Sequence, residues 1–184
     1  MASNATFVTA GYGQVEPNHL SAQRTGQIYA QLPAASTITQ LENGQFVKYD
    51  YEQGVCNFAG PGEWMLVYNE VKVYREGEGD ADFAMIKGNY AAQVYDDYGH
   101  AMPTGTSMVP RLFKTNVGDI MTTNTITGTD ATIVAGAMLA PAASNGILAV
   151  VASADQAAAP MLWQVVKVYT MPDGKKGAKI MRIK

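Results

Sequence analysis

The chain has 184 residues, of which 47 % are hydrophobic and only 16 % are charged, and its formal net charge is −3. This length fits one domain or two small ones, and the charged fraction lies below the ~25 % of an average soluble domain. The acidic balance disfavours nucleic acid as a partner, because phosphate would be repelled. No apolar run reaches the ~20 residues of a membrane-spanning helix, so we expect no membrane partner either.

Residues 1–35 read as an extended N-terminal arm. They carry few charges, and their scattered apolar residues follow no helical period, although residues 18–23 could form one helical turn. An untethered terminus is usually disordered, so we expect the arm to be mobile or to lie on its own domain or a neighbour. Residues 1–10 lack the basic and apolar segments of a signal peptide, which predicts synthesis in the cytoplasm. The candidate contact residues of the arm are Phe7, Tyr12, Ile28 and Tyr29.

The first part of the body predicts a hairpin followed by a central strand. Asn43-Gly44 lies between two β-rich runs within residues 37–51, and Asn-Gly is the strongest short hairpin signal. Residues 54–62 read as a loop. Residues 63–74 contain an unbroken apolar run, Trp64 to Tyr68, followed by alternation, which indicates a central strand that is buried on both faces at its first end.

The second part of the body predicts short strands separated by turns. The expected strand regions are residues 84–98, 112–114, 120–126, 132–139 and 147–152. Turns are expected at residues 116–119 and 145–146. A short helix is expected over residues 152–159 because they are rich in alanine and precede a proline. The chain then closes with hairpin 162–183. We therefore expect an all-β fold with a β-barrel, β-tulip or sandwich-like body over residues 36–184.

The charges are unevenly distributed along the chain. From residue 161 onward there are six basic residues and a single acid, Asp173, whereas the rest of the chain has fifteen acids and seven basic residues. Such a basic piece could dock on an acidic partner, or it could be an ordinary solvated hairpin. Its candidate interface residues are Lys175, Lys176, Lys179 and Arg182.

No catalytic set, metal site or cofactor motif is evident in the sequence. The two histidines, His19 and His100, lack the spacing of metal ligands. The lone Cys56 has no partner for a disulfide or a zinc site and is expected to be a small buried hydrophobe. No serine lies in a Gly-x-Ser-x-Gly elbow. We therefore expect no enzyme, no cofactor and no metal.

Three weaker patterns leave alternatives open. The acidic loop over residues 76–82 places carboxylates at alternate positions, which fits either a calcium loop or a solvated turn. Tyr90, Tyr95 and Tyr98 fit either a sugar platform or half-buried sheet residues. Paired acids such as Asp96-Asp97 could serve glycoside hydrolysis, although any chain with 16 acids offers such pairs.

Three segments resemble those of small structural proteins of tailed-phage virions. They are Leu41–Val47, Gly118–Asn124 and the closing Val165-Val166-Lys167 with Pro172-Asp173-Gly174. The closest class is the capsid decoration (cement) or head-fibre-base type. The resemblance implies a β-barrel or β-tulip body, an arm that grips the shell, a homo-oligomer with a trimer favoured, and the major capsid protein as partner.

The resulting hypothesis is a non-enzymatic virion structural protein that binds and stabilises an assembled phage capsid. It would be located in the virion after synthesis in the host cytoplasm. The alternative is a carbohydrate- or surface-binding β module.

Overall fold

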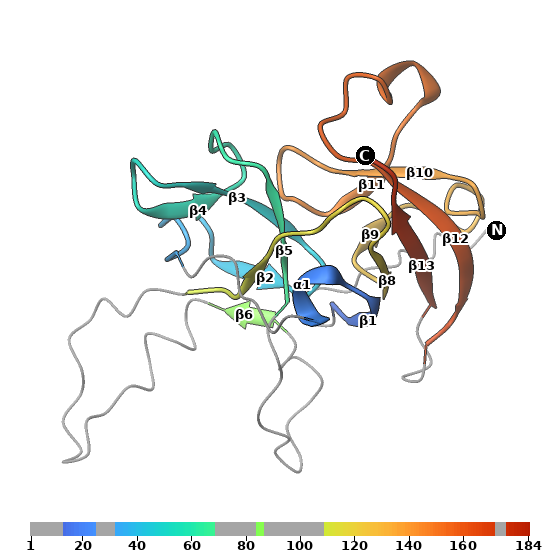
Figure 1. The fold of residues 1–184 in the computed structure, drawn as a ribbon, viewed down its shortest axis with the longest axis horizontal. Coiled ribbons are helices and arrows are strands. Elements are labelled where there is room, and N and C mark those ends of the chain that lie inside the picture. Colours follow the sequence, from blue (N-terminus) through green and yellow to red (C-terminus); the bar gives the residue numbers. More distant parts are fainter. Residues whose placement is uncertain (1–12, 25–31, 69–83, 87–108, 172–175) are drawn as a thin grey trace, which may run out of the picture.

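The computed structural model describes residues 13–24, 32–68, 84–86, 109–171 and 176–184 (Figure 1). These residues form an all-β fold, as expected from the sequence, with one four-residue helical turn, α1 (Ser21–Arg24). None of the described residues forms a helix of the length and apolarity that a membrane crossing requires. The strands are β1 (Val15–His19), β2 (Gln40–Glu42), β3 (Phe46–Asp50), β4 (Val55–Asn57), β5 (Trp64–Val67), β6 (Ala84–Ile86), β7 (Leu112–Phe113), β8 (Ile120–Thr123), β9 (Ile126–Thr127), β10 (Met138–Pro141), β11 (Leu148–Val150), β12 (Trp163–Thr170) and β13 (Lys176–Arg182).

Seven strands form the large sheet, in the order β1-β8-β13-β12-β10-β11-β9. Only Asn124 and Thr125 separate β8 from β9, so these two strands lie within about 11 Å of each other. In a flat sheet the same strands would lie about 24 Å apart, at ~4.8 Å per strand. The large sheet must therefore curl round so that its ends approach. It remains open, and no closed barrel occurs among the described strands.

The small sheet has four antiparallel strands in the order β4-β3-β5-β7, and β2 pairs with β6 in a separate two-stranded sheet. The small sheet lies beside the large one (Figure 1). All four residues of the inner strand β5 are buried, which confirms the predicted central strand over residues 64–67. Residues 69–74 of that prediction lie outside the described residues.

The predicted hairpin around Asn43-Gly44 is wrong in its pairing, although the turn itself forms. Gln45 N donates to Glu42 O at 3.2 Å, and Gly44 has a φ of +91°. However, β2 pairs with β6, and β3 pairs with β4 and β5. The reason is tertiary: the turn is buried between the sheets, where Gly44 N donates to Val67 O at 2.9 Å and Thr125 Oγ1 donates to Asn43 O at 2.5 Å.

Two other predicted hairpins form, and residues 172–175, the predicted turn of the second, lie outside the described residues. β10 and β11 pair as an antiparallel hairpin across Asn145-Gly146, where Gly146 has a φ of +68°. The long β12–β13 hairpin also forms, and α1 supplies the predicted helical turn.

The elements predicted from local sequence pattern differ from the structure at three segments. Residues 132–137 form turns, so the predicted strand begins only at Met138. The predicted loop over residues 54–62 contains the short strand β4. On the edge of β4 that does not pair with β3, Cys56 O accepts from Ala35 N and Cys56 N donates to Pro33 O. The predicted helix over residues 152–159 is reduced to a 3-10 turn at Ser153–Asp155.

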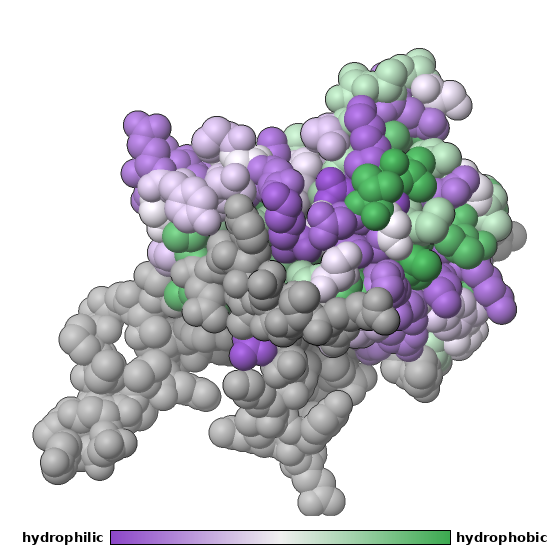
Figure 2. All heavy atoms as spheres, viewed as in Figure 1, coloured by the Kyte–Doolittle hydropathy of each residue, from purple (hydrophilic) through white to green (hydrophobic). Residues whose placement is uncertain are grey.

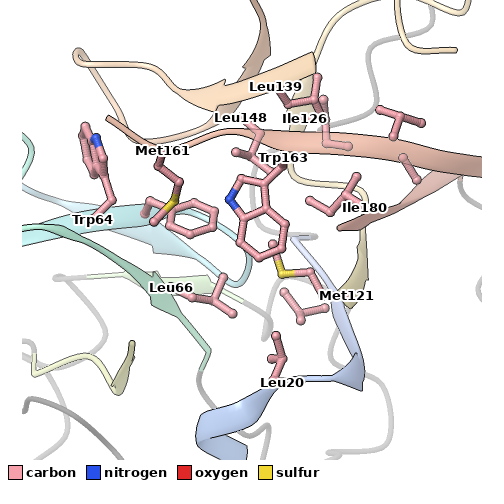
Figure 3. Close-up of a cluster of buried hydrophobic side chains, with 14 of the residues drawn as sticks. Leu20, Trp64, Leu66, Met121, Ile126, Leu139, Leu148, Met161, Trp163 and Ile180 are labelled. Atoms are coloured by element: carbon pink, nitrogen blue, oxygen red, sulfur yellow. The ribbon is translucent and has the colours of Figure 1, made fainter. Parts of the chain in front are cut away.

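Two buried clusters hold the sheets together. The first lies between the large and small sheets and surrounds Trp163 (Figure 3). The ring centroid of Trp163 is 5.8 Å from that of Phe46. The second lies on the opposite face of the small sheet and includes Cys56 and Met65. Because neighbouring residues of β5 point into different clusters, that strand is apolar without alternation.

Candidate interaction surface

The outer face of the large sheet is the surface that turns away from the first cluster across strands β1, β8, β13 and β12. On β13, Ala178 and Ile180 are buried in that cluster. Because side chains alternate along a strand, Lys179 and Met181 point to the outer face. The pairing of strands places ten residues on this face: Glu16, His19, Ile120, Thr122, Gln164, Lys167, Tyr169, Gly177, Lys179 and Met181.

Two lysines lie directly opposite each other on the outer face. Lys167 of β12 pairs in register with Lys179 of β13; Lys167 is exposed and Lys179 is half-buried. The Lys167 ammonium lies 6.0 Å from the centroid of the Tyr169 ring. Among the described residues, neither lysine forms an ion pair. Like charges directly opposite each other in a sheet are destabilising, so the lysine pair lowers the stability of the fold.

The other basic residues of the hairpin are engaged within the chain. Lys176 forms an ion pair with Asp130, and Lys184 Nζ donates to Ala157 O at 2.8 Å. Arg182 Nη1 donates to Thr115 O and, at 3.0 Å, to Thr115 Oγ1. Burial lowers the pKa of Arg182, and the nearby carboxylates oppose this shift.

These contacts divide the candidate residues of the basic hairpin. Lys179 lies on the outer face, whereas Lys176 and Arg182 hold neighbouring loops, and Lys175 lies outside the described residues. Sequence reasoning missed Lys167 as an interface residue. Its place in the alternating Val-Lys-Val-Tyr run indicated an outward side chain. The register irregularity between Val165 and Lys167, which sets it opposite Lys179, had no signal in the sequence.

Tyr169 forms a hydrogen bond with the carboxylate of Glu16, the acid that lies in the same row as the two lysines. Its hydroxyl lies 2.8 Å from Thr122 Oγ1 and 3.1 Å from Glu16 Oε2 and shares its proton between them. It reaches across Gly177, the residue directly opposite it on β13. Burial, with a further contribution from Glu16, raises the pKa of Tyr169, so the hydroxyl stays a donor at neutral pH. Glu16 is therefore committed to Tyr169.

The described part of the N-terminal segment lies on its own domain. β1 forms one edge of the large sheet by pairing with β8. Gly13 N donates to the buried Glu42 carboxylate at 2.9 Å. Pro17 lies in β1, beside a register irregularity, and both features discourage pairing of this edge with another strand. The candidate residues Phe7, Tyr12, Ile28 and Tyr29 lie outside the described residues.

The reactive side chains of the described residues are dispersed or buried. No group of three or more His, Cys, Asp and Glu residues that could hold a metal occurs in this part of the chain. Cys56 is buried, as predicted, and burial raises its pKa to about 12, so its thiol is protonated at neutral pH. His19 is exposed on β1. The remaining candidates of the sequence analysis, His100, the acidic loop over residues 76–82, Asp96-Asp97 and the three tyrosines at 90, 95 and 98, lie outside the described residues.

Comparisons with protein-family models, with curated proteins and with solved structures gave no match for this chain. Its function is therefore argued from its own residues. Among the described ones, the outer face combines unpaired charge with partly exposed apolar side chains, and it is the candidate site.

Proposed function

We propose that this protein is a non-enzymatic virion structural protein that binds the outside of an assembled tailed-phage capsid and stabilises it. Its partner would be the major capsid protein, and its place the virion, after synthesis in the host cytoplasm. The observation that carries the proposal is the outer face, a sheet surface on which two lysines without an anionic partner among the described residues lie beside two apolar residues. Such a surface suits adhesion to a neighbour better than turnover of a small substrate.

The apolar pair of the outer face consists of Ile120 and Met181, which are opposite each other on β8 and β13. Both are half-buried and belong to neither buried cluster. On the side of the molecule where β12 and β13 lie, hydrophobic and hydrophilic residues alternate over the surface (Figure 2). An apolar centre with a polar rim is the usual anatomy of a protein interface.

The size of the outer face indicates that it does not act alone. Four strands at ~4.8 Å and about five residues at ~3.3 Å span roughly 300 Å². A stable interface buries about 800 Å² per partner. We therefore propose that the N-terminal arm supplies further contacts and that copies assemble into a homo-oligomer, with a trimer favoured, because linked sites gain avidity without new contacts. The curled large sheet would be the barrel-like or tulip-like body of this class.

Co-sedimentation with capsids that have been stripped of accessory proteins tests the proposal. We expect the full chain to sediment with the capsids, Met181→Asp to weaken binding at least about ten-fold, and removal of residues 1–12 to weaken it further. The matched control is Val117→Asp, because Val117 is 68 % exposed at a turn outside the outer face. An absence of binding, or equal loss in both Asp variants, would contradict the proposal.

The alternative function, a carbohydrate-binding module, is favoured by one observation on the small sheet. Tyr51 is 59 % exposed, and its ring centroid lies 4.7 Å from that of Tyr49 at an angle of 50°. An exposed aromatic ring can stack on the apolar face of a sugar. A glycan array distinguishes the two functions: hits that disappear in Tyr51→Ala would favour the module, whereas no hits would count against it.

A further inference from the structure

We propose that the outer face binds a protein surface that presents a carboxylate beside apolar side chains, and that Lys167 and Lys179 together hold this carboxylate. The identity of that partner as a capsid rests on the proposed function. The chemistry of recognition rests on the lysine pair alone.

The two lysines repel each other within the large sheet. Lys167 and Lys179 are cross-strand neighbours on inner strands of the large sheet, where opposed like charges are destabilising. Edge strands often carry lysines that prevent aggregation, but β12 and β13 are not edges. An external anion between the two ammonium groups would convert this repulsion into attraction.

The other cations near the pair are engaged within the chain. The described residues from 161 to 184 carry five basic side chains and no acid. Lys176, Arg182 and Lys184 are engaged by groups of the same chain. Lys167 and Lys179 are left without an anionic partner in the part of the chain that the structure describes. The nearest acid in their row, Glu16, already accepts from Tyr169.

The geometry of the lysine pair suits a carboxylate. Directly opposed side chains in an antiparallel sheet have Cβ atoms about 5 Å apart, and each lysine ends in a flexible ammonium with three donors. The two ammonium groups can therefore approach the two oxygens of one carboxylate. The Lys167 ammonium lies 6.0 Å from the centroid of the Tyr169 ring, on the same face of the sheet.

The surroundings favour carboxylates of a folded partner over a nucleic acid. Glu16 lies two strands from Lys179 in the same row, and the whole chain is acidic with a net charge of −3. An extended polyphosphate would cross this negative potential, whereas a single carboxylate that docks with an apolar neighbour would not. Ile120 and Met181, in the adjacent row, supply the apolar contact that a protein surface can match.

The experiment is a titration of the isotopically labelled full chain with a hexaglutamate peptide, followed by NMR amide shifts. We expect the shifts to centre on β12 and β13 and the binding to weaken as NaCl is raised. The double variant K167Q/K179Q should bind at least about five-fold more weakly than wild type. The matched control K176Q/K184Q removes the same charge from the same hairpin, at lysines engaged within the chain, and should bind within about two-fold of wild type.

The possible results separate the two proposals. Equal weakening in both double variants, or tighter binding of a DNA oligonucleotide than of hexaglutamate at the lysine pair, overturns this inference. Capsid binding that K167Q/K179Q leaves unchanged also overturns it while preserving the proposed function. Peptide binding that depends on the pair, in a protein that does not sediment with capsids, supports the carboxylate chemistry and removes the capsid as its source.

Discussion

Gly146 offers a sharp test of how the two sheets are joined. Its backbone oxygen accepts a hydrogen bond from Phe46 N at 2.8 Å, which ties the β10–β11 turn to the start of β3. A Cβ atom at this position would overlap the carbonyl oxygen of Phe46, far inside the 3.0 Å that real Cβ atoms keep. Gly146→Ala should therefore force the turn and β3 apart.

Gly54 is the matched control because its φ is nearly the same as that of Gly146 and its surroundings are not crowded. Its φ is +67°, against +68° for Gly146, but a Cβ atom there would meet no other atom within 4 Å. Both substitutions share the left-handed strain of about 1–2 kcal/mol, which is partly offset by reduced freedom of the unfolded chain. Gly54→Ala should cost about 1 kcal/mol.

Gly146→Ala should cost a further 2–4 kcal/mol or so, because the shift breaks the Phe46 hydrogen bond and leaves buried polar groups unpaired. The total of about 3–5 kcal/mol is a large part of the stability of a typical domain. It would lower the thermal midpoint by roughly 10 °C. Urea unfolding of both variants measures the difference. Values that agree within about 1 kcal/mol would refute the close contact between the β10–β11 turn and β3.

Three further predictions concern single side chains. The buried indole nitrogen of Trp163 has no hydrogen-bond acceptor among the described residues, so Trp163→Phe should cost at least about 2 kcal/mol less than Trp163→Ala in urea unfolding. Burial raises the pKa of Cys56 from 9.0 to about 12. The buried neutral thiol therefore contributes fully to the free energy of unfolding below pH 9, and this contribution falls as pH rises toward 12, by up to ~1.4 kcal/mol per pH unit. Cys56→Ala should flatten this alkaline loss of stability. Tyr169→Phe should cost about 1 kcal/mol by removing its hydroxyl from Thr122 and Glu16, whereas Tyr51→Phe should change stability by less than about 0.5 kcal/mol.

Each of these predictions has a result that would contradict it. A Trp163→Phe variant as unstable as Trp163→Ala would mean that the nitrogen has a partner. Alkaline unfolding that is identical with and without the Cys56 thiol would remove it from the pH dependence. A neutral Tyr169→Phe would show that its hydroxyl is equally well satisfied by water.

Local pattern was a good guide where neighbours in the chain are also neighbours in space. The β12–β13 and β10–β11 hairpins follow from turn residues between apolar runs, because a short loop brings adjacent strands together. The apolar run from Trp64 to Val67 predicted a strand buried on both faces, and β5 is such a strand. The expected burial of the lone Cys56 was likewise confirmed.

Local pattern failed where distant segments compete for the same hydrogen bonds. Asn43-Gly44 has the residues of a hairpin turn, yet Val67 and Thr125 bind its backbone and direct β2 and β3 to different sheets. β1 joins the large sheet through pairing with β8, more than 100 residues away, which no short-range periodicity reveals.

The sequence by itself determined the all-β class, the positions of most strands and the excess of basic residues in the closing hairpin, because side-chain alternation and turn chemistry act over a few residues. Only the tertiary structure decided which of the described basic residues have partners within the chain and which have no anionic partner among the described residues. Arg182 and Lys176 meet partners from distant loops, whereas a register irregularity sets Lys167 opposite Lys179. Strand register and long-range contacts depend on how the whole chain packs, so the candidate surface emerged only with the fold.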